Sequence, residues 1–202
     1  MYNPFNESST FFIQILFDFY IFIVLLKIIL QRVGADFYNP ISQSIVKLTD
    51  APINIMRRYL PMWQDFDMAA VGLAFVLELI KLLLVIVIKT AGFPDILGLL
   101  LWAIGDLLSQ TINILFYSTL AIAIIGWFAP TMRSPIVGLL NQITDPLFKL
   151  TRQYVPPFKG LDLSALVILV GLELMTMLVI HPLFRVGIGR VFSKYITSVV
   201  PL

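Results

Sequence analysis

The sequence has no cysteine and a single histidine, His181. The missing thiols exclude disulfide frameworks, thiolate nucleophiles, Cys-ligated zinc and iron–sulfur clusters. One histidine leaves little for a multi-histidine metal site, and the absence of a Gly-x-Ser-x-Gly sequence disfavours a serine hydrolase. We therefore expect no catalytic residue, no metal and no cofactor, and we expect the protein not to be an enzyme. His181 is interpreted as an interfacial residue.

Charge is scarce as well. Charged residues make up 13% of the 202 positions, the formal net charge is +2, and the basic residues are separated by apolar ones. This pattern does not fit a nucleic-acid-binding surface. Hydrophobic residues make up 59% of the chain and the mean hydropathy is +0.93, which is more apolar surface than a soluble domain of this length can bury. The composition predicts an integral membrane protein.

Long apolar segments predict the membrane crossings. Residues 11–30, 68–88 and 163–184 are each about 20 residues long, which at about 1.5 Å per residue matches a hydrocarbon core of roughly 30 Å. The apolar stretch 96–129 is too long for one untilted crossing. We place its crossing at 107–128 and interpret 91–106 as an interfacial lead-in helix, with a tilted extension of the span as the alternative.

An internal repeat becomes visible when the chain is aligned with itself at an offset of 95 residues. The aligned identities include Pro40 with Pro135, Asp50 with Asp145, Arg57 with Arg152, Pro61 with Pro156, Asp67 with Asp162, and Glu78 with Glu173. Each copy holds two spans with a polar segment between them, so both halves must share one orientation in the membrane.

The predicted fold class is all-α integral membrane, with four transmembrane helices in two tandem parallel repeats. Each repeat has an interfacial amphipathic helical segment between its two spans. The predicted divisions are 1–90 for the first repeat, 91–106 for the lead-in helix, 107–185 for the second repeat and 186–202 for a short basic tail.

The polar segments carry the pattern of amphipathic helices. In the second copy, apolar residues recur at i, i+3, i+4 and i+7 from Ile136 to Ile143. Asp145 followed by Pro146 is typical of an N-cap and a first-turn proline, and predicts the start of a second short helix. Such helices most simply lie at the headgroup level, where lysine and arginine reach anionic lipid phosphates. A surface for docking a partner is the alternative.

Two copies of one motif carry a family resemblance. The first copy is Phe37-Tyr38-Asn39-Pro40, Thr49-Asp50-Ala51-Pro52, Arg57-Arg58 and Pro61, and the second is Ser134-Pro135, Thr144-Asp145-Pro146-Leu147, Arg152, Pro156 and Asp162-Leu163-Ser164. Over nearly the whole chain this pattern resembles the YggT family, also called YlmG-like. The resemblance implies a bacterial inner-membrane or chloroplast protein, linked variously to osmotic stress and potassium homeostasis, to cell-division gene neighbourhoods and to haem attachment in plastids. It implies no catalytic residue.

Polar side chains inside the predicted spans are candidates for function, because charge in hydrocarbon is costly. The predicted polar layer consists of Gln14, Asp18, Glu78, Lys81, Asn113 and Glu173. We expect Lys81 to face Asp18 or Glu173 across a helix interface. The layer is interpreted either as a polar site or a proton and cation relay, or as polar contacts that fix helix pairing. Lys27, near the end of its span, is expected to reach the interface.

The leading hypothesis is a non-enzymatic inner-membrane protein that organises lipids or partner proteins, with a role in membrane homeostasis or assembly. The alternative is a small cation or proton transporter or channel, or a subunit regulating one, and this would need a homo-oligomer because one bundle encloses little room for a pore. The expected partners are a bilayer with anionic lipids and other membrane proteins, and no nucleic acid. Segments 31–67 and 127–161 hold eight Lys and Arg residues, against four in the termini and middle connection. This bias predicts cytoplasmic repeat segments and periplasmic termini.

Overall fold

The computed structural model describes residues 4–35, 38–60, 67–90, 93–129, 131–154 and 163–199, with side chains as far as residue 191. All regular elements in these ranges are helical. They are α1 (Pro4–Arg32), α2 (Pro40–Met56), α3 (Met68–Thr90), α4 (Ile96–Phe128), α5 (Pro135–Tyr154), α6 (Ser164–Met175), the π-helical turn η1 (Thr176–Ile180) and α7 (His181–Val199).

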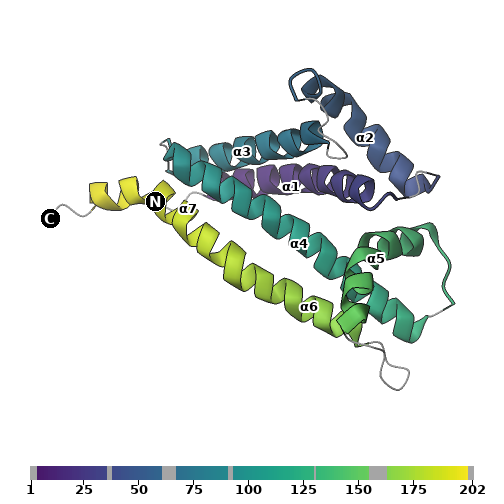
Figure 1. Ribbon diagram of the computed structural model, residues 1–202. Helices are drawn as coiled ribbons and strands as arrows, with labels where there is room; N and C mark the ends of the chain where they lie inside the picture. Colours follow the sequence, from purple (N-terminus) through teal and green to yellow (C-terminus); the bar gives the residue numbers. More distant parts are fainter. Residues whose placement is uncertain are drawn as a thin grey trace.

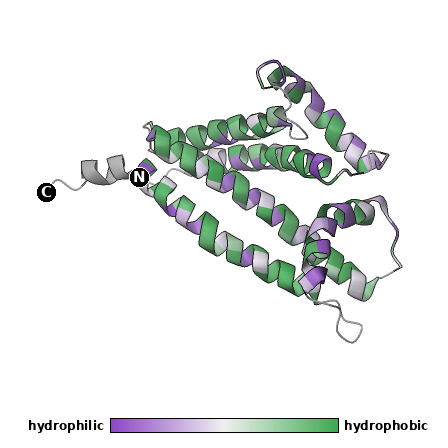
Figure 2. Cartoon of the chain, viewed as in Figure 1, coloured by the Kyte–Doolittle hydropathy of each residue, from purple (hydrophilic) through white to green (hydrophobic). Residues whose placement is uncertain are grey.

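Four helical stretches in the described ranges are long and apolar enough to cross a membrane. They are Phe5–Arg32, Met68–Thr90, Ile96–Phe128 and Ser164–Val191. Hydrophobic residues cover these stretches along most of their length, whereas α2 and α5 alternate hydrophobic with hydrophilic positions (Figure 2). The all-helical prediction with four spans is therefore confirmed.

The two halves follow the same order of elements. In each half a spanning helix, α1 or α4, leads to an amphipathic helix, α2 or α5, and α2 and α5 lie at the same end of the molecule (Figure 1). The two halves meet there, because the Asn39 side-chain amide donates a hydrogen bond of 2.7 Å to the carbonyl oxygen of Pro135. The arrangement is that of a tandem repeat.

Helix α4 holds the two halves together. Its Ile114 belongs to a buried cluster with Ile21 and Val24 of α1 and Leu73 of α3. Ile112, on the same helix, belongs to another buried cluster with residues of α5, α6 and η1. Side chains of α4 that point toward α1 and α3 therefore pack in the core of the first half, although α4 begins the second repeat.

The segment 96–106 is not a separate lead-in helix. It forms the first turns of α4, which runs unbroken for 33 residues from Ile96. The Asp95 carboxylate caps this helix by accepting a hydrogen bond of 3.0 Å from the Gly98 N–H, and no proline follows within it. The alternative of an extended span therefore holds.

The predicted helix start at Asp145 and Pro146 is also absent. Helix α5 continues through Pro146, as α2 continues through Pro52. A proline inside a helix leaves the carbonyl four residues earlier without its donor. In α2 that carbonyl belongs to Leu48, and the Tyr20 hydroxyl of α1 donates to it at 3.1 Å. A hydrogen bond from α1 therefore replaces the one that Pro52 removes within α2.

The last span is longer than predicted. Helical structure continues from Ser164 beyond Phe184 to Val199, and the candidate span reaches Val191. The π-helical turn precedes Pro182, and the His181 N–H bonds the carbonyl of Thr176, five residues earlier. A wide turn of this kind accommodates a proline that cannot donate to the helix.

Candidate functional site

A buried ammonium group lies among three carboxylates near the middle of the first half. Lys81 of α3 is 3% exposed. Its Nζ lies 2.7 Å from Asp18 Oδ1 of α1, 2.8 Å from Glu78 Oε1 one turn earlier, and 2.8 Å from Asp106 Oδ2 of α4. Lys81 therefore joins three spanning helices through charge-assisted contacts, and Asp18 is one of the two partners expected for it from the sequence.

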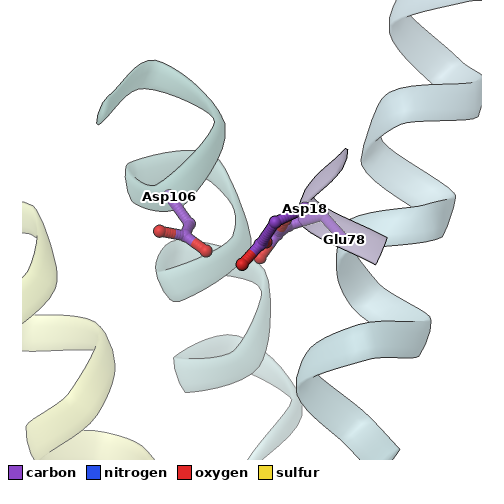
Figure 3. A group of neighbouring side chains, drawn as sticks. All are labelled: Asp18, Glu78 and Asp106. Carbon is purple, nitrogen blue, oxygen red and sulfur yellow. The ribbon is translucent and has the colours of Figure 1, made fainter. Parts of the chain in front are cut away.

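The three carboxyl groups converge on one point (Figure 3). Oxygen atoms of Asp18, Glu78 and Asp106 lie within 4.8 Å of one another. This set could in principle ligate a metal ion, but the Lys81 ammonium is already in contact with all three. The second oxygen of Glu78 accepts a hydrogen bond of 3.4 Å from the Gln110 side-chain amide. We call Asp18, Glu78, Lys81 and Asp106 the charged cluster.

The charged cluster is unbalanced, with one ammonium for three carboxyl groups. Glu78 is fully buried, whereas the side chains of Asp18 and Asp106 are 48% and 27% exposed. Charge in a low-dielectric environment is costly unless it is paired. The two partly exposed carboxyl groups are therefore the part of the cluster that could exchange a proton or meet an external cation.

Asp106 was missed as a site residue because sequence reasoning placed it in the interfacial lead-in segment. The signal was present in the spacing, since Gln110 and Asn113 follow at i+4 and i+7 and so share one face of α4. That face reaches the first half: Asp106 contacts Lys81, and Gln110 contacts Glu78.

Glu173 and Gln14, both predicted members of the polar layer, lie outside the charged cluster and are exposed. Helix α6 packs through Ala165, Ile168 and Leu172, and Glu173 follows Leu172 by about 100° around the helix, away from that face. The repeat thus makes Glu173 equivalent to Glu78 in sequence but not in burial. Asn113, the counterpart of Asp18, is exposed too and lines a groove.

The groove has a volume of about 680 Å³ and lies between the two halves. Its walls come from α1, α2, α4 and α5, with Phe22, Leu26, Ile41 and Leu140 among the apolar residues. Asp18, Asp106, Gln110 and Asn113 line it as well. We call it the inter-repeat groove. It combines a long apolar surface with the accessible side of the charged cluster.

The motif of the first repeat ties α2 to both spans. Pro40 begins α2, and Asp50 binds Lys27 of α1 at 2.9 Å. Arg57 binds Asp67 at 2.6 Å, and Asp67 also accepts a hydrogen bond of 3.3 Å from the Ala70 N–H at the start of α3. Lys27 is therefore paired with the amphipathic helix α2, and its reach to the membrane interface stays a prediction. Pro61 lies outside the described residues.

In the second repeat, the motif aspartate of α5 pairs within its own helix. Pro135 begins α5, and Asp145 binds Lys149 of the same helix at 2.5 Å. Pro146 lies inside the helix, and the Arg152 guanidinium lies 5.1 Å from the centre of the Phe148 ring. Pro156 and Asp162 lie outside the described residues. Among the described motif residues, Asp145 therefore differs from its counterpart Asp50 in its ion-pair partner.

Fold and site together define a four-span membrane protein built from two tandem repeats around an intramembrane charged cluster. The CCB3/YggT family model matches residues 7–88 and 101–183, one segment for each repeat, and the chain belongs to that family. This result confirms both the family resemblance and the internal repeat.

Bacterial relatives extend over most of the chain. An uncharacterised protein of Vibrio alginolyticus in the proC 3' region is 39% identical, covering 83% of this chain and 90% of the relative. YggT of Escherichia coli K12, also described as uncharacterised, is 34% identical, covering 90% of this chain and 94% of the relative. No solved structure matches the chain.

Proposed function

We propose that this YggT-family protein is a non-enzymatic protein of the bacterial inner membrane that organises lipids or partner proteins, in membrane homeostasis or in the assembly of other membrane components. The observation that carries the proposal is the inter-repeat groove of about 680 Å³. Most of its lining residues are apolar, and in a bilayer we expect acyl chains or a partner helix to cover them. The polar side chains along the groove, such as Asn113, would select among the lipids or helices that bind there.

The proposed orientation places α2 and α5 at the cytoplasmic headgroup level and the termini in the periplasm. Both helices lie at one end of the molecule, and their segments hold eight of the Lys and Arg residues. Basic residues there contact anionic lipid phosphates. The family resemblance suggests survival under hyperosmotic stress as the cellular readout of this function.

In-cell photo-crosslinking tests the groove. A photoreactive phenylalanine analogue is placed at Ile136, which lines the groove and is 52% exposed, or at Leu166 of α6, which is 59% exposed and does not line it. We expect a discrete lipid adduct or one defined protein adduct from Ile136 and not from Leu166. The same diffuse lipid adducts from both positions would refute the proposal.

The charged cluster favours a second candidate, a proton or cation transporter or a subunit that regulates one. Asp18 and Asp106 line the inter-repeat groove and carry the accessible carboxyl groups of the cluster. Proton and potassium flux into proteoliposomes separates the two candidates. Flux above empty liposomes that falls in Asp106→Asn supports transport, whereas the absence of such flux leaves the lipid and partner role.

A further inference from the structure

A second cavity lies beneath α5 in the second half. It has a volume of about 310 Å³ and is separate from the inter-repeat groove. Its lining includes Ile122 and Trp127 of α4, Asn141, Asp145 and Arg152 of α5, and Ala165 of α6. We call it the α5 pocket. Its lining combines a carboxylate, a guanidinium and an amide with apolar side chains, near the end of a spanning helix.

The equivalent residues of the first repeat show which chemical group the Asp145 carboxylate can bind. At the 95-residue offset Asp145 corresponds to Asp50, and Ile122 corresponds to Lys27. In the first repeat the Lys27 ammonium reaches the Asp50 carboxylate at 2.9 Å, and the Lys27 side chain is only 7% exposed. The chain itself therefore places a primary ammonium against this aspartate, between the spanning helix and the amphipathic helix.

The second repeat keeps the aspartate and loses the lysine. Ile122 carries no charge, and the α5 pocket is lined by Ile122 and Asp145, the counterparts of Lys27 and Asp50. The carboxylate thus faces a cavity that the equivalent half fills with an ammonium group. An external ammonium would restore the same pair.

Lys149 does not take the place of Lys27. Its Nζ binds Asp145 Oδ2 at 2.5 Å, four residues apart on α5, and the two side chains are 72% and 51% exposed. Exposed pairs of this kind contribute little and exchange readily. Lys149 is not part of the pocket lining, so the contact leaves the cavity open.

The remaining polar groups suit a phosphodiester. Arg152 lines the α5 pocket and is positioned over the Phe148 ring, and guanidinium groups bind phosphate through paired donors. The Asn141 side chain adds a further hydrogen-bonding group. Trp127 lies next to the last residue of α4, where aromatic rings mark the membrane interface.

We propose that the α5 pocket binds the headgroup of a phospholipid carrying a primary ammonium, of the phosphatidylethanolamine class. The ammonium contacts Asp145, as Lys27 contacts Asp50, and the phosphate lies beside Arg152. This inference rests on the proposed role in lipid organisation and names the lipid class for one site. Phosphatidylcholine cannot donate a hydrogen bond from its quaternary ammonium, and phosphatidylglycerol has no cation.

Native mass spectrometry of the full chain tests the proposal. The protein is titrated with phosphatidylethanolamine, phosphatidylcholine or phosphatidylglycerol of identical acyl chains. Only the primary ammonium can donate a charge-assisted hydrogen bond to Asp145, so we expect phosphatidylethanolamine to bind about tenfold more tightly than phosphatidylcholine. Asp145→Asn should abolish this preference, and Lys149→Met should retain it.

Ile122→Lys is the most specific variant, because it gives the second repeat the internal ammonium of the first. We expect it to occupy the pocket and remove the preference for phosphatidylethanolamine without lowering the thermal stability. An unchanged preference in Ile122→Lys, or no preference in the unmodified protein, would overturn the proposal. Competition by soluble glycerophosphoethanolamine at equal concentration would overturn the assignment to a lipid.

The two proposals fail separately. If the preference for phosphatidylethanolamine is absent while the discrete adduct from Ile136 is retained, the α5 pocket assignment is wrong and the role of the inter-repeat groove stands. If both are absent, the lipid and partner role is wrong as well.

Discussion

The Tyr20 hydroxyl donates a hydrogen bond of 3.1 Å to the carbonyl oxygen of Leu48, which Pro52 leaves without a helical donor. This contact joins the first span to the amphipathic helix of the same repeat. Because Pro52 removes a hydrogen bond within α2 and Tyr20 replaces it from α1, the proline ties the helix to its neighbour.

Tyr20→Phe should therefore destabilise the protein by about 1 kcal/mol, the net value of a hydrogen bond. In a Pro52→Ala background the same substitution should cost less, because the Ala N–H can bond Leu48 instead. Thermal unfolding in detergent of the four proteins in this double-mutant cycle measures the coupling. Tyr59→Phe, whose ring is 79% exposed, is the matched control. Equal effects of Tyr20→Phe in both backgrounds would refute the link.

Lys81→Met should be strongly destabilising, because it leaves three carboxyl groups without their shared ammonium. Removing one partner of a buried ion pair costs about 3–5 kcal/mol. Adding Asp18→Asn, Glu78→Gln and Asp106→Asn should recover part of the loss, since the neutral set no longer needs a cation. Lys149→Met, which breaks an exposed pair, is the control and should have little effect. A Lys81→Met protein as stable as the unmodified chain would mean that the charged cluster contributes nothing to folding.

Gly187→Ala should disrupt the contact between α7 and α4. A Cβ atom at Gly187 would lie 2.9 Å from the Trp102 backbone nitrogen and 3.2 Å from its Cα, and backbone atoms of a packed helix cannot move aside easily. Overpacking of this kind costs about 1–3 kcal/mol. Gly189→Ala, two residues along the same helix, meets no atom within 4 Å and should leave the unfolding temperature unchanged. If the two variants unfold alike, the helices do not pack closely at this glycine.

The orientation predicts that alkaline phosphatase fused after Leu202 is active, because the positive-inside bias places the termini in the periplasm. A cytoplasmic fluorescent reporter at the same junction should stay dark. An inactive phosphatase together with a fluorescent reporter would invert the topology and place α2 and α5 outside the cytoplasm.

The sequence predicted the elements that depend on length and periodicity. Apolar runs located the four spans, and the 95-residue offset located the two repeats, because neither requires knowledge of tertiary contacts. The continuity of α2 through Pro52 could not be predicted, since it depends on a hydroxyl from another helix.

The candidate site was predictable only in part. Lys81 was expected to face either Asp18 or Glu173, and the structure pairs it with Asp18. Asp106 was missed because the start of α4 was assigned to the interface. Glu173 was included because the repeat makes it equivalent to Glu78, yet a repeat preserves position in the chain and not the neighbours around it. The second repeat has no counterpart of Lys81, since Thr176, the first residue of η1, stands at that place.

Electron cryomicroscopy of the protein in lipid nanodiscs tests most directly the claim that the inter-repeat groove is a binding site. We expect elongated density of an acyl chain or a partner helix between Phe22 and Ile136. The same map should place the Lys81 ammonium within hydrogen-bonding distance of Asp18, Glu78 and Asp106. A groove closed by direct packing of α1 on α5, or a Lys81 side chain that points into lipid, would contradict the account.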